Sequence, residues 1–385
     1  MNFHRTAAAA RPFANALVAG FALAALAACT DSVNPTPVAQ SSLRILHEGA
    51  PVDISPDGSL ALLEDRYTGS GTLYQFNVTT GVLTETGSIG DIGYNFSTGI
   101  STDGRISGVY NMPVSAGVYT PGSGWLDIGT QFSSGCDINV AGAYDISANG
   151  HVVVGIMWDG CNAAAFRWTD ASGQGAFLPL QVLGTPWPGS TAAPSNRATK
   201  VSDNGLVVGG FAQTDMVDRW PAVWRANGTG FMLPGLSIPG FGPDWPGEVL
   251  SINPDGSMVA GIWSGEGFYW TAGTGSVSIG RLATSDPSDP VYATAIAAGG
   301  QLIFGTIGSP WGMNPPAAFV WTQAAGMQAL EELAVAAGIV MPPGYHLIRA
   351  TAASTDGTVV LGAATDSKGR ETSFVLRLPV SAYGL

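Results

Sequence analysis

Charged residues are scarce in this chain. They make up 11% of its 385 residues, against about 25% in a typical soluble domain. Glycine, in contrast, contributes 53 residues. Long solvated helices carry charged faces, so this balance favours many tight turns and strands built from small residues. The length allows one large or two average domains.

Motifs for catalysis and metal binding are also lacking. The sequence contains no H-E-x-x-H, G-x-S-x-G or P-loop motif and no paired-cysteine zinc spacing. Its Asp-Gly turns lack the alternating acids of a calcium loop. His47, His151 and His346 fall in or beside predicted strands of different repeats. We therefore predict no catalytic residue, metal or cofactor, although a pair of carboxylates could still perform acid–base chemistry.

Basic residues are too few to favour nucleic acid. Removal of residues 1–28 takes away two arginines and leaves 13 basic against 28 acidic side chains, a net charge of −15. Such a surface repels nucleic acid and anionic lipid and suits neutral, cationic or metal-bridged partners. Solubility alone is the simpler interpretation of this charge.

The N-terminus has the pattern of an export signal. Arg5 and Arg11 precede an apolar stretch, residues 14–28, that is short for a membrane span. It ends in Leu26-Ala27-Ala28-Cys29, which looks like a bacterial lipobox. That resemblance implies removal of residues 1–28 and lipid attachment at Cys29. An ordinary secretory signal followed by a chance cysteine is the alternative.

Residues 29–41 are polar and contain proline, which predicts a lipid-anchored tether. Thr30, rather than aspartate, follows the cysteine, so we expect the outer membrane, with the lipid anchor as the membrane contact. Which side of that membrane the folded part faces stays open. The expected localisation is the bacterial cell envelope, periplasmic or surface-exposed.

A turn signature close to Ser-x-Asp/Asn-Gly recurs seven times and precedes apolar runs that mostly end in glycine. Its spacing of about 50 residues is in the range of β-propeller blades. Asn-Gly and Asp-Gly suit hairpin turns because both central residues need positive φ. The turn glycines are Gly58, Gly104, Gly150, Gly205, Gly256, Gly300 and Gly357. The predicted fold is therefore an all-β, seven-bladed propeller over residues 42–380, with 381–385 as a tail.

The last repeat supplies only three strands, the third being residues 372–378, and then the chain nearly stops. Residues 43–47 form an unpaired strand candidate before the first repeat. Pairing the two completes the seventh blade and removes open sheet edges. Before that blade, residues 327–337 have the apolar spacing of a short helix.

Aromatic residues recur once per repeat near one position of the third strand. We expect them to pack between sheets, with a ladder of ligand-stacking rings as the alternative. The set is Phe76, Tyr119, Trp168, Trp224, Trp270, Trp321 and Phe374.

Two segments resemble bacterial extracellular HAF-type repeats: Ala165-Phe166-Arg167-Trp168 and Ala318-Phe319-Val320-Trp321, each downstream of a turn and a Val/Ile-rich strand. The resemblance covers roughly residues 50–379, but Ala164 and Ala317 stand where the motif has histidine. It implies a secreted or envelope protein and assigns no catalytic residues. Ser55-Pro56-Asp57-Gly58 and Asn253-Pro254-Asp255-Gly256 also look like TolB-type propeller repeats.

Two cysteines remain after the lipobox. Cys136 lies in the connection entering the third repeat, and Cys161 lies in the loop between its second and third strands. Both connections fall on one face of one predicted blade, and the envelope is oxidising, so we predict a disulfide between them.

The same face collects tryptophans outside the periodic set, accompanied by acids and arginines. They could form a platform for a sugar ring or a peptide, or they could only cap blade ends. The candidate ligand face consists of Trp158, Trp187, Trp220, Trp245, Trp263 and Trp311.

These features predict a lipid-anchored, monomeric envelope propeller that acts as a non-enzymatic binding or assembly scaffold. Its expected partner is an envelope protein or a glycan. The alternative is a glycan-acting hydrolase or lyase, or a glycan-binding module, that uses the tryptophan-rich face.

Overall fold

A computed structural model describes residues 41–65, 71–88, 98–110, 115–129, 140–158, 163–170, 176–186, 193–214, 219–236, 247–308 and 315–385. The predicted signal peptide and lipid-attachment residue Cys29 lie outside these ranges, and so do Cys136 and Cys161. Among the described residues, no helix is both long enough and apolar enough to cross a membrane.

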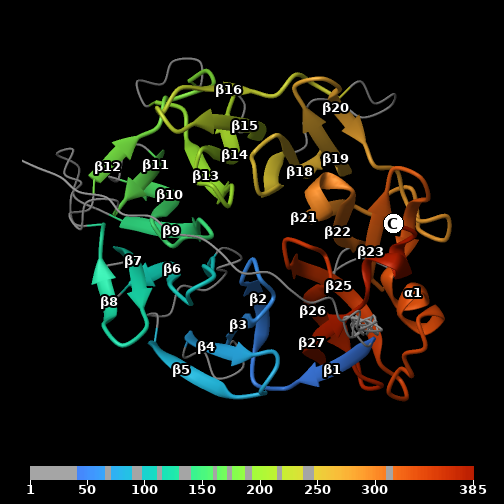
Figure 1. The fold of residues 1–385 in the computed structure, drawn as a ribbon. Coiled ribbons are helices and arrows are strands. Elements are labelled where there is room, and N and C mark those ends of the chain that lie inside the picture. Colours follow the sequence, from blue (N-terminus) through green and yellow to red (C-terminus); the bar gives the residue numbers. More distant parts are fainter. Residues whose placement is uncertain are drawn as a thin grey trace, which may run out of the picture. The chain divides into compact units, whose positions relative to one another are not determined.

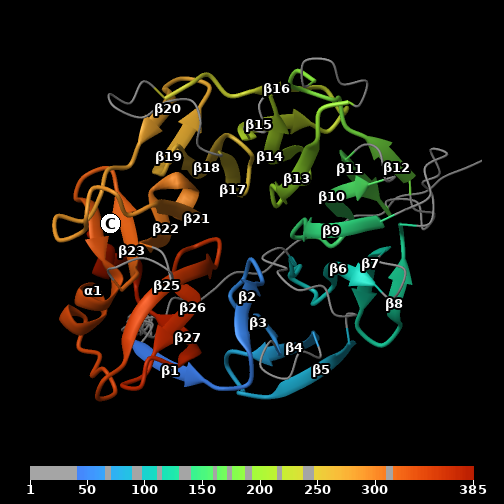
Figure 2. The same ribbon diagram turned by 180° about the vertical axis from the view of Figure 1, so that it is seen from behind.

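Seven sheets surround a common axis, as predicted for a seven-bladed propeller (Figures 1 and 2). Six are four-stranded and one, β6–β7–β8, has three strands among the described residues. We number the blades in chain order: blade 1 is β2–β5, blade 2 is β6–β8, and blades 3 to 6 take four strands each from β9 to β24. Blade 7 is β25–β27 together with β1.

Strands at equivalent positions share a depth in the ring. The innermost strands are β2 (Ala50–Ile54), β9 (Val140–Ile146), β13 (Asn196–Val201), β17 (Glu248–Ile252), β21 (Val291–Ala297) and β25 (His346–Ala353). The second strands are β3 (Leu60–Glu64), β6 (Ile106–Tyr110), β10 (Val152–Trp158), β14 (Val207–Gln213), β18 (Met258–Trp263), β22 (Leu302–Ile307) and β26 (Val359–Thr365). The third are β4 (Thr72–Asn77), β7 (Ser115–Thr120), β11 (Ala163–Thr169), β15 (Arg219–Arg225), β19 (Glu266–Thr271), β23 (Ala317–Thr322) and β27 (Glu371–Arg377). The outermost are β5 (Leu83–Ser88), β8 (Gly124–Asp127), β12 (Ala176–Pro179), β16 (Gly230–Met232), β20 (Gly275–Ser278), β24 (Gly326–Ala329) and β1 (Ser42–Leu46).

The chain ends meet in blade 7, as predicted. β1 pairs antiparallel with β27, and Leu43 lies opposite Leu376 while Ile45 lies opposite Phe374. Leu46, at the end of β1, is 2% exposed. The closing strand therefore contributes backbone hydrogen bonds and a core side chain.

The helix predicted at residues 327–337 is shorter than expected. α1 spans Leu330–Ala336, and Met327 instead belongs to β24, the outer strand of blade 6. The 3₁₀-helices are η1 (Ala298–Gly300), at the degenerate turn of blade 6, and η2 (Val380–Tyr383). Tyr383 of η2 is buried with its ring edge-on to Phe304, so the predicted tail packs on the last blades.

The periodic aromatics pack between sheets, as expected. Phe76, Trp168, Trp224 and Phe374 are at most 2% exposed. Tyr119, Trp270 and Trp321 are partly buried and pack against apolar clusters that join neighbouring blades. The sheets therefore stack through these rings.

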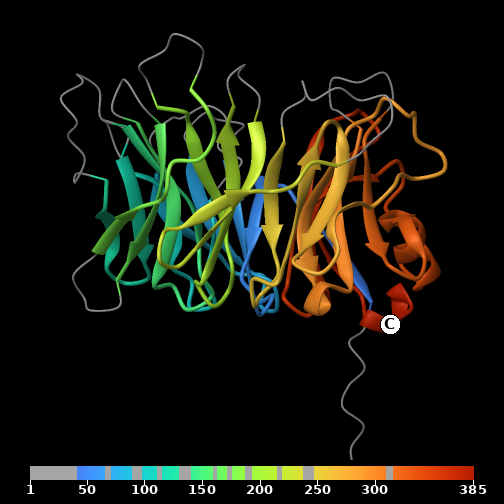
Figure 3. The same cartoon turned by 90° about the horizontal axis from the view of Figure 1, so that it is seen from above.

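The seven signature turns lie at one end of the ring, the lower end in Figure 3, which we call the turn end. The other, where second strands lead into third strands, is the loop end. In six of the seven turns, all except the turn of Gly300, the glycine has φ between 70° and 83° and its Cα faces the preceding blade. A Cβ at Gly205, for example, would lie 2.6 Å from Val152 Cγ2 in blade 3. The turn glycine is thus required both by its φ and by contact between blades.

Backbone hydrogen bonds also join successive turns around the axis. The donor in each link is an N–H near the second turn residue, and the acceptor is a carbonyl in the next blade's turn. The bonds run from Thr102 to Ala148, Ala148 to Asp203, Asn204 to Pro254, Ala298 to Thr355 and Thr355 to Pro56. Pro56 and Pro254 have no N–H, so they accept in this ring and cannot donate to the following turn.

Candidate functional site

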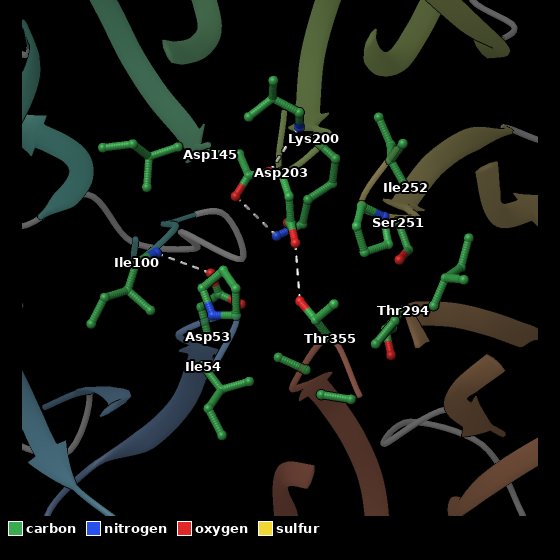
Figure 4. A pocket seen from close by; sticks show the side chains of 18 of the residues that line it. Asp53, Ile54, Ile100, Asp145, Lys200, Asp203, Ser251, Ile252, Thr294 and Thr355 are labelled. Atoms are coloured by element: carbon green, nitrogen blue, oxygen red, sulfur yellow. Dashed lines mark hydrogen bonds and ion pairs between the residues drawn. The ribbon is translucent and has the colours of Figure 1, made fainter. Parts of the chain in front are cut away.

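A cavity of about 90 Å³ lies on the propeller axis near the turn end (Figure 4). Its walls are the last residues of the innermost strands and the second residues of the turns, among them Pro56, Asp203, Pro254 and Thr355. Several of these wall residues are partly exposed. The axial pocket, as we call it, is large enough for several water molecules or one small charged group.

A β-bulge brings side chains from each innermost strand to the axis. The pairing register of all six innermost strands shifts near the second or third residue before the turn serine or its equivalent. Bulges bend a strand and re-aim the side chains beside them. The residues two before the turn are Asp53, Asp145, Lys200, Ser251, Ala295 and Ala352, and all six line the pocket.

Glycine in the second strand makes room for these bulges. A Cβ at Gly155, Gly210, Gly261, Gly305 or Gly362 would collide with a carbonyl oxygen of the innermost strand. These are the glycines that end the apolar runs of the sequence. Their regular placement therefore reflects the close packing of each second strand against the bulged innermost strand of the same blade.

Asp145 and Lys200 form the central ion pair of the pocket. Lys200 Nζ lies 3.5 Å from Asp145 Oδ1, and the Val201 N–H donates to Asp145 Oδ2 at 2.8 Å. In blade 2, which lies between the blades of Asp53 and Asp145, the equivalent position is Gly99. A Cβ at Gly99 would collide with Asp145 Oδ1. The carboxyl group therefore packs directly on the backbone of blade 2.

Asp53 repeats the same arrangement two blades earlier, in blade 1. The Ile100 N–H of blade 2 donates to Asp53 Oδ2 at 3.0 Å, just as Val201 of blade 4 donates to Asp145 of blade 3. Each carboxylate thus joins its own blade to the next. At the mouth, Thr355 Oγ1 donates to Asp203 Oδ2 at 3.0 Å and joins blades 7 and 4 across the axis (Figure 4).

Acidic groups outnumber basic ones in this pocket, with three carboxyls and one ammonium. Burial raises the pKa of Asp145 to about 6, and the neighbouring Asp53 carboxylate adds to the rise. Burial also raises the pKa of Asp53 and of Asp203. Burial opposes the Lys200 charge, but the carboxylates of Asp145 and Asp53 outweigh it and raise the lysine pKa. The pocket therefore favours an additional positive charge.

The opposite side of the pocket is mostly apolar. Ile252, Ala295 and Ala352 line it together with Thr294 and Thr351. Thr294 Oγ1 donates to the Ala350 carbonyl of the next blade at 2.6 Å. Thr351 occupies the equivalent bulge position, but its buried hydroxyl has no hydrogen-bond partner among the described residues.

The described members of the tryptophan-rich face, Trp158, Trp220 and Trp263, lie at the loop end, opposite the axial pocket. Trp158 is 43% exposed, whereas Trp263 is 4% exposed and packs edge-on against Trp220 at 5.0 Å between ring centroids. Trp187, Trp245 and Trp311 lie outside the described residues. Ligand binding by this face stays a prediction, and of the described members Trp158 offers the exposed ring.

Acids at the loop end are held by arginines. Arg197 of blade 4 binds Glu248 of blade 5 in a bidentate pair with Nη2 2.6 Å from Oε2. Three further acids, Glu266, Asp366 and Glu371, contact Arg281, Arg370 and Arg349 at 2.5 to 2.6 Å. Within the described residues, no group of three or more His, Cys, Asp or Glu side chains has the geometry to hold a metal ion.

Comparison with known proteins shows similarity of fold alone. No protein-family model matches the chain, and no curated protein sequence matches it. Among solved structures, a catalytically inactive virginiamycin B lyase from Staphylococcus aureus with quinupristin has 14% identity and a TM-score of 0.51. The alignment covers 88% of this chain and 100% of the lyase. An oligogalacturonate lyase from Vibrio parahaemolyticus has 13% identity and a TM-score of 0.51, with 89% of this chain and 98% of that protein covered.

A TolB-type propeller is also among the structural neighbours. TolB from Acinetobacter baumannii has 15% identity and a TM-score of 0.38 over 60% of this chain. The match spans about half of TolB, 52% of its length. At this TM-score the likeness supports no argument about activity or location.

Sequence reasoning did not single out the axial pocket. Asp53, Asp145 and Lys200 occur in three separate repeats outside any recognised motif, and Asp203 is the variable second residue of the turn signature that follows Lys200. A usable signal was present, however, because charged residues in strands of this chain are uncommon and three of these four stand two residues before a turn serine.

Proposed function

We propose that this propeller is a non-enzymatic binding or assembly scaffold of the bacterial cell envelope, anchored through lipid on Cys29. The anchor and location derive from the lipobox-like sequence. The HAF-type resemblance agrees with an envelope or secreted protein. The partner is an envelope protein or a glycan.

The observation that carries this proposal is the pairing of the charged side chains. At the loop end, Glu248 and Glu266 are each bound to an arginine, and so are Asp366 and Glu371. Because each of these carboxylates is bound by an arginine, we favour a structural role for them over a role as the acid and base of a catalytic pair. The axial pocket, in contrast, retains an imbalance of charge and opens at the turn end, which favours binding of a ligand group.

A glycan-acting enzyme is the second candidate. It is motivated by the two propellers of similar fold whose names describe lyases, one of them an oligogalacturonate lyase. At 13–14% identity this likeness concerns the fold. A glycan hydrolase would need two carboxylates about 5 to 9.5 Å apart in an open cleft.

Photo-crosslinking in the native envelope tests the scaffold. A photoreactive residue replaces Thr102, exposed at the turn end, or Trp158, exposed at the loop end. A third variant carries it at Leu126, 54% exposed on outer strand β8, as a control. We expect a discrete adduct from at least one end and none from Leu126. Absence of an adduct at both ends, together with turnover of envelope glycans by the purified chain, would overturn the proposal.

A further inference from the structure

The axial pocket has a composition that points to one class of ligand. Carboxyls of blades 1, 3 and 4 form one side, and Ile252, Ala295 and Ala352 form the other. A ligand that satisfies both sides carries a positive head and a short apolar stem.

We propose that the axial pocket binds a primary ammonium group on an alkyl stem, as found in a lysine side chain or an alkyl diamine. The inference rests on the proposed function, because it treats the pocket as a binding site. It adds the chemistry of the group that is bound.

The first argument is the charge inside the pocket. With all groups ionised, three carboxylates and one ammonium leave a net charge of −2. Lys200 contacts Asp145, whereas Asp53 interacts unfavourably with both Asp145 and Asp203 and raises the pKa of each. A second cation near Asp53 and Asp203 would relieve this repulsion. Carboxylates retain capacity to accept such a donor, since each has about four lone-pair sites.

The second argument is the Thr351 hydroxyl. The equivalent threonines Thr199 and Thr294 hydrogen-bond to the next blade, to Glu248 and to the Ala350 carbonyl. Thr351 lines the pocket, its Oγ1 is buried, and no described residue hydrogen-bonds to it. A buried polar atom without a partner is costly, and a bound ammonium would supply three N–H donors.

An organic cation suits the pocket better than a metal ion. The Lys200 ammonium already lies beside Asp145, and it would repel a divalent ion about twice as strongly as a singly charged ammonium at the same distance. Among the described residues, the acids do not converge as a ligand set for a metal. The alanine and isoleucine side chains of blades 5 to 7 add apolar contacts that a metal cannot use but an alkyl stem can.

Calorimetric titration of the full-length chain in detergent tests this inference. The probes are the capped peptide Gly-Lys-Gly, its norleucine counterpart and 1,5-diaminopentane. We expect an ammonium-bearing probe to bind at least tenfold more tightly than the norleucine peptide. Binding of the lysine peptide identifies a protein side chain as the source, and binding of the diamine alone identifies a free polyamine.

Two variants keep the test independent of folding. Asp53→Asn retains an oxygen that accepts from Ile100, and Asp203→Asn retains one for Thr355. Each should weaken ammonium binding at least tenfold with the melting temperature maintained. Asp286→Asn, the same change in an exposed turn, should leave affinity unchanged.

Binding should also weaken as pH falls below about 6, because Asp145 is then protonated in a pocket shared with Asp53, Asp203 and Lys200.

Equal affinity for the lysine and norleucine peptides, or unchanged affinity in Asp53→Asn and Asp203→Asn, would overturn the inference. The scaffold proposal would survive that result if crosslinked adducts still form at either end of the ring. If those adducts are also absent and the purified chain turns over envelope glycans, both proposals fail.

Discussion

The contact between each turn glycine and the preceding blade yields a quantitative prediction for Gly205. Gly205 has φ +71°, and a Cβ there would lie 2.6 Å from Val152 Cγ2. Gly280 has the same φ of +71° but nothing within 4 Å of the corresponding position. The two sites therefore carry the same backbone strain, and only Gly205 adds a steric conflict between blades.

The left-handed conformation costs an alanine about 1–2 kcal/mol. Overpacking of a well-packed interior adds about 1–3 kcal/mol. We therefore expect Gly280→Ala to lower the free energy of unfolding by about 1–2 kcal/mol and Gly205→Ala to lower it by roughly 2–5 kcal/mol. Urea denaturation of the two variants measures the difference, provided that the slopes of the transitions agree.

A double-mutant cycle separates the contact from the strain. Val152→Ala removes the methyl groups that Gly205→Ala would strike, so the double variant should be more stable than the sum of the single changes by about 1–3 kcal/mol. The reasoning is refuted if the two glycine variants are equally destabilised, or if Gly205→Ala and Val152→Ala show no coupling.

Three further predictions concern the ion pairs, the closure and the pocket. Arg197→Met should destabilise the chain by about 3–5 kcal/mol, because it leaves Glu248 buried without its bidentate partner; the matched Arg370→Met, at a pair whose arginine is 71% exposed, should cost under about 1 kcal/mol by thermal melting. Leu46→Ala should cost about 2–5 kcal/mol and accelerate amide exchange in β1 and β27, and unchanged exchange there would contradict a closing role for β1. The Asp145 pKa of about 6 exceeds the ordinary value of 3.8, so the folded chain binds more protons than the unfolded chain between about pH 4 and 6. The contribution of this group to stability therefore falls by about 3 kcal/mol as pH rises through that window, and a carboxyl NMR titration midpoint near 4 would contradict it.

The ring could be predicted from the sequence because its signals are local. Asp/Asn-Gly pairs, with Gly299-Gly300 in the sixth repeat, specify hairpins within a few residues, and their recurrence about every 50 residues counts the blades. Closure followed from one missing strand at residues beyond 378 and one extra strand at residues 43–47. The α1 boundary was less accurate, since the apolar spacing continued through Met327 although pairing with β23 held that residue in β24.

The axial pocket could not be predicted in the same way. Asp53, Asp145 and Lys200 come together because bulges in three separate strands turn them to one axis. The pattern of alternating side chains does not reveal a bulge, and the pairing of Asp145 with Lys200 spans 55 residues. The missing hydrogen-bond partner of Thr351 can be recognised only in the structure, where the equivalent Thr199 and Thr294 do have partners.

The most direct test of a binding role is to incubate the full-length chain with peptides and oligosaccharides prepared from the bacterial envelope and to analyse the retained and released fractions by mass spectrometry. The account predicts that one component is retained with its mass unchanged. Release of a cleaved or eliminated product, dependent on the purified chain, would contradict it and establish an enzyme.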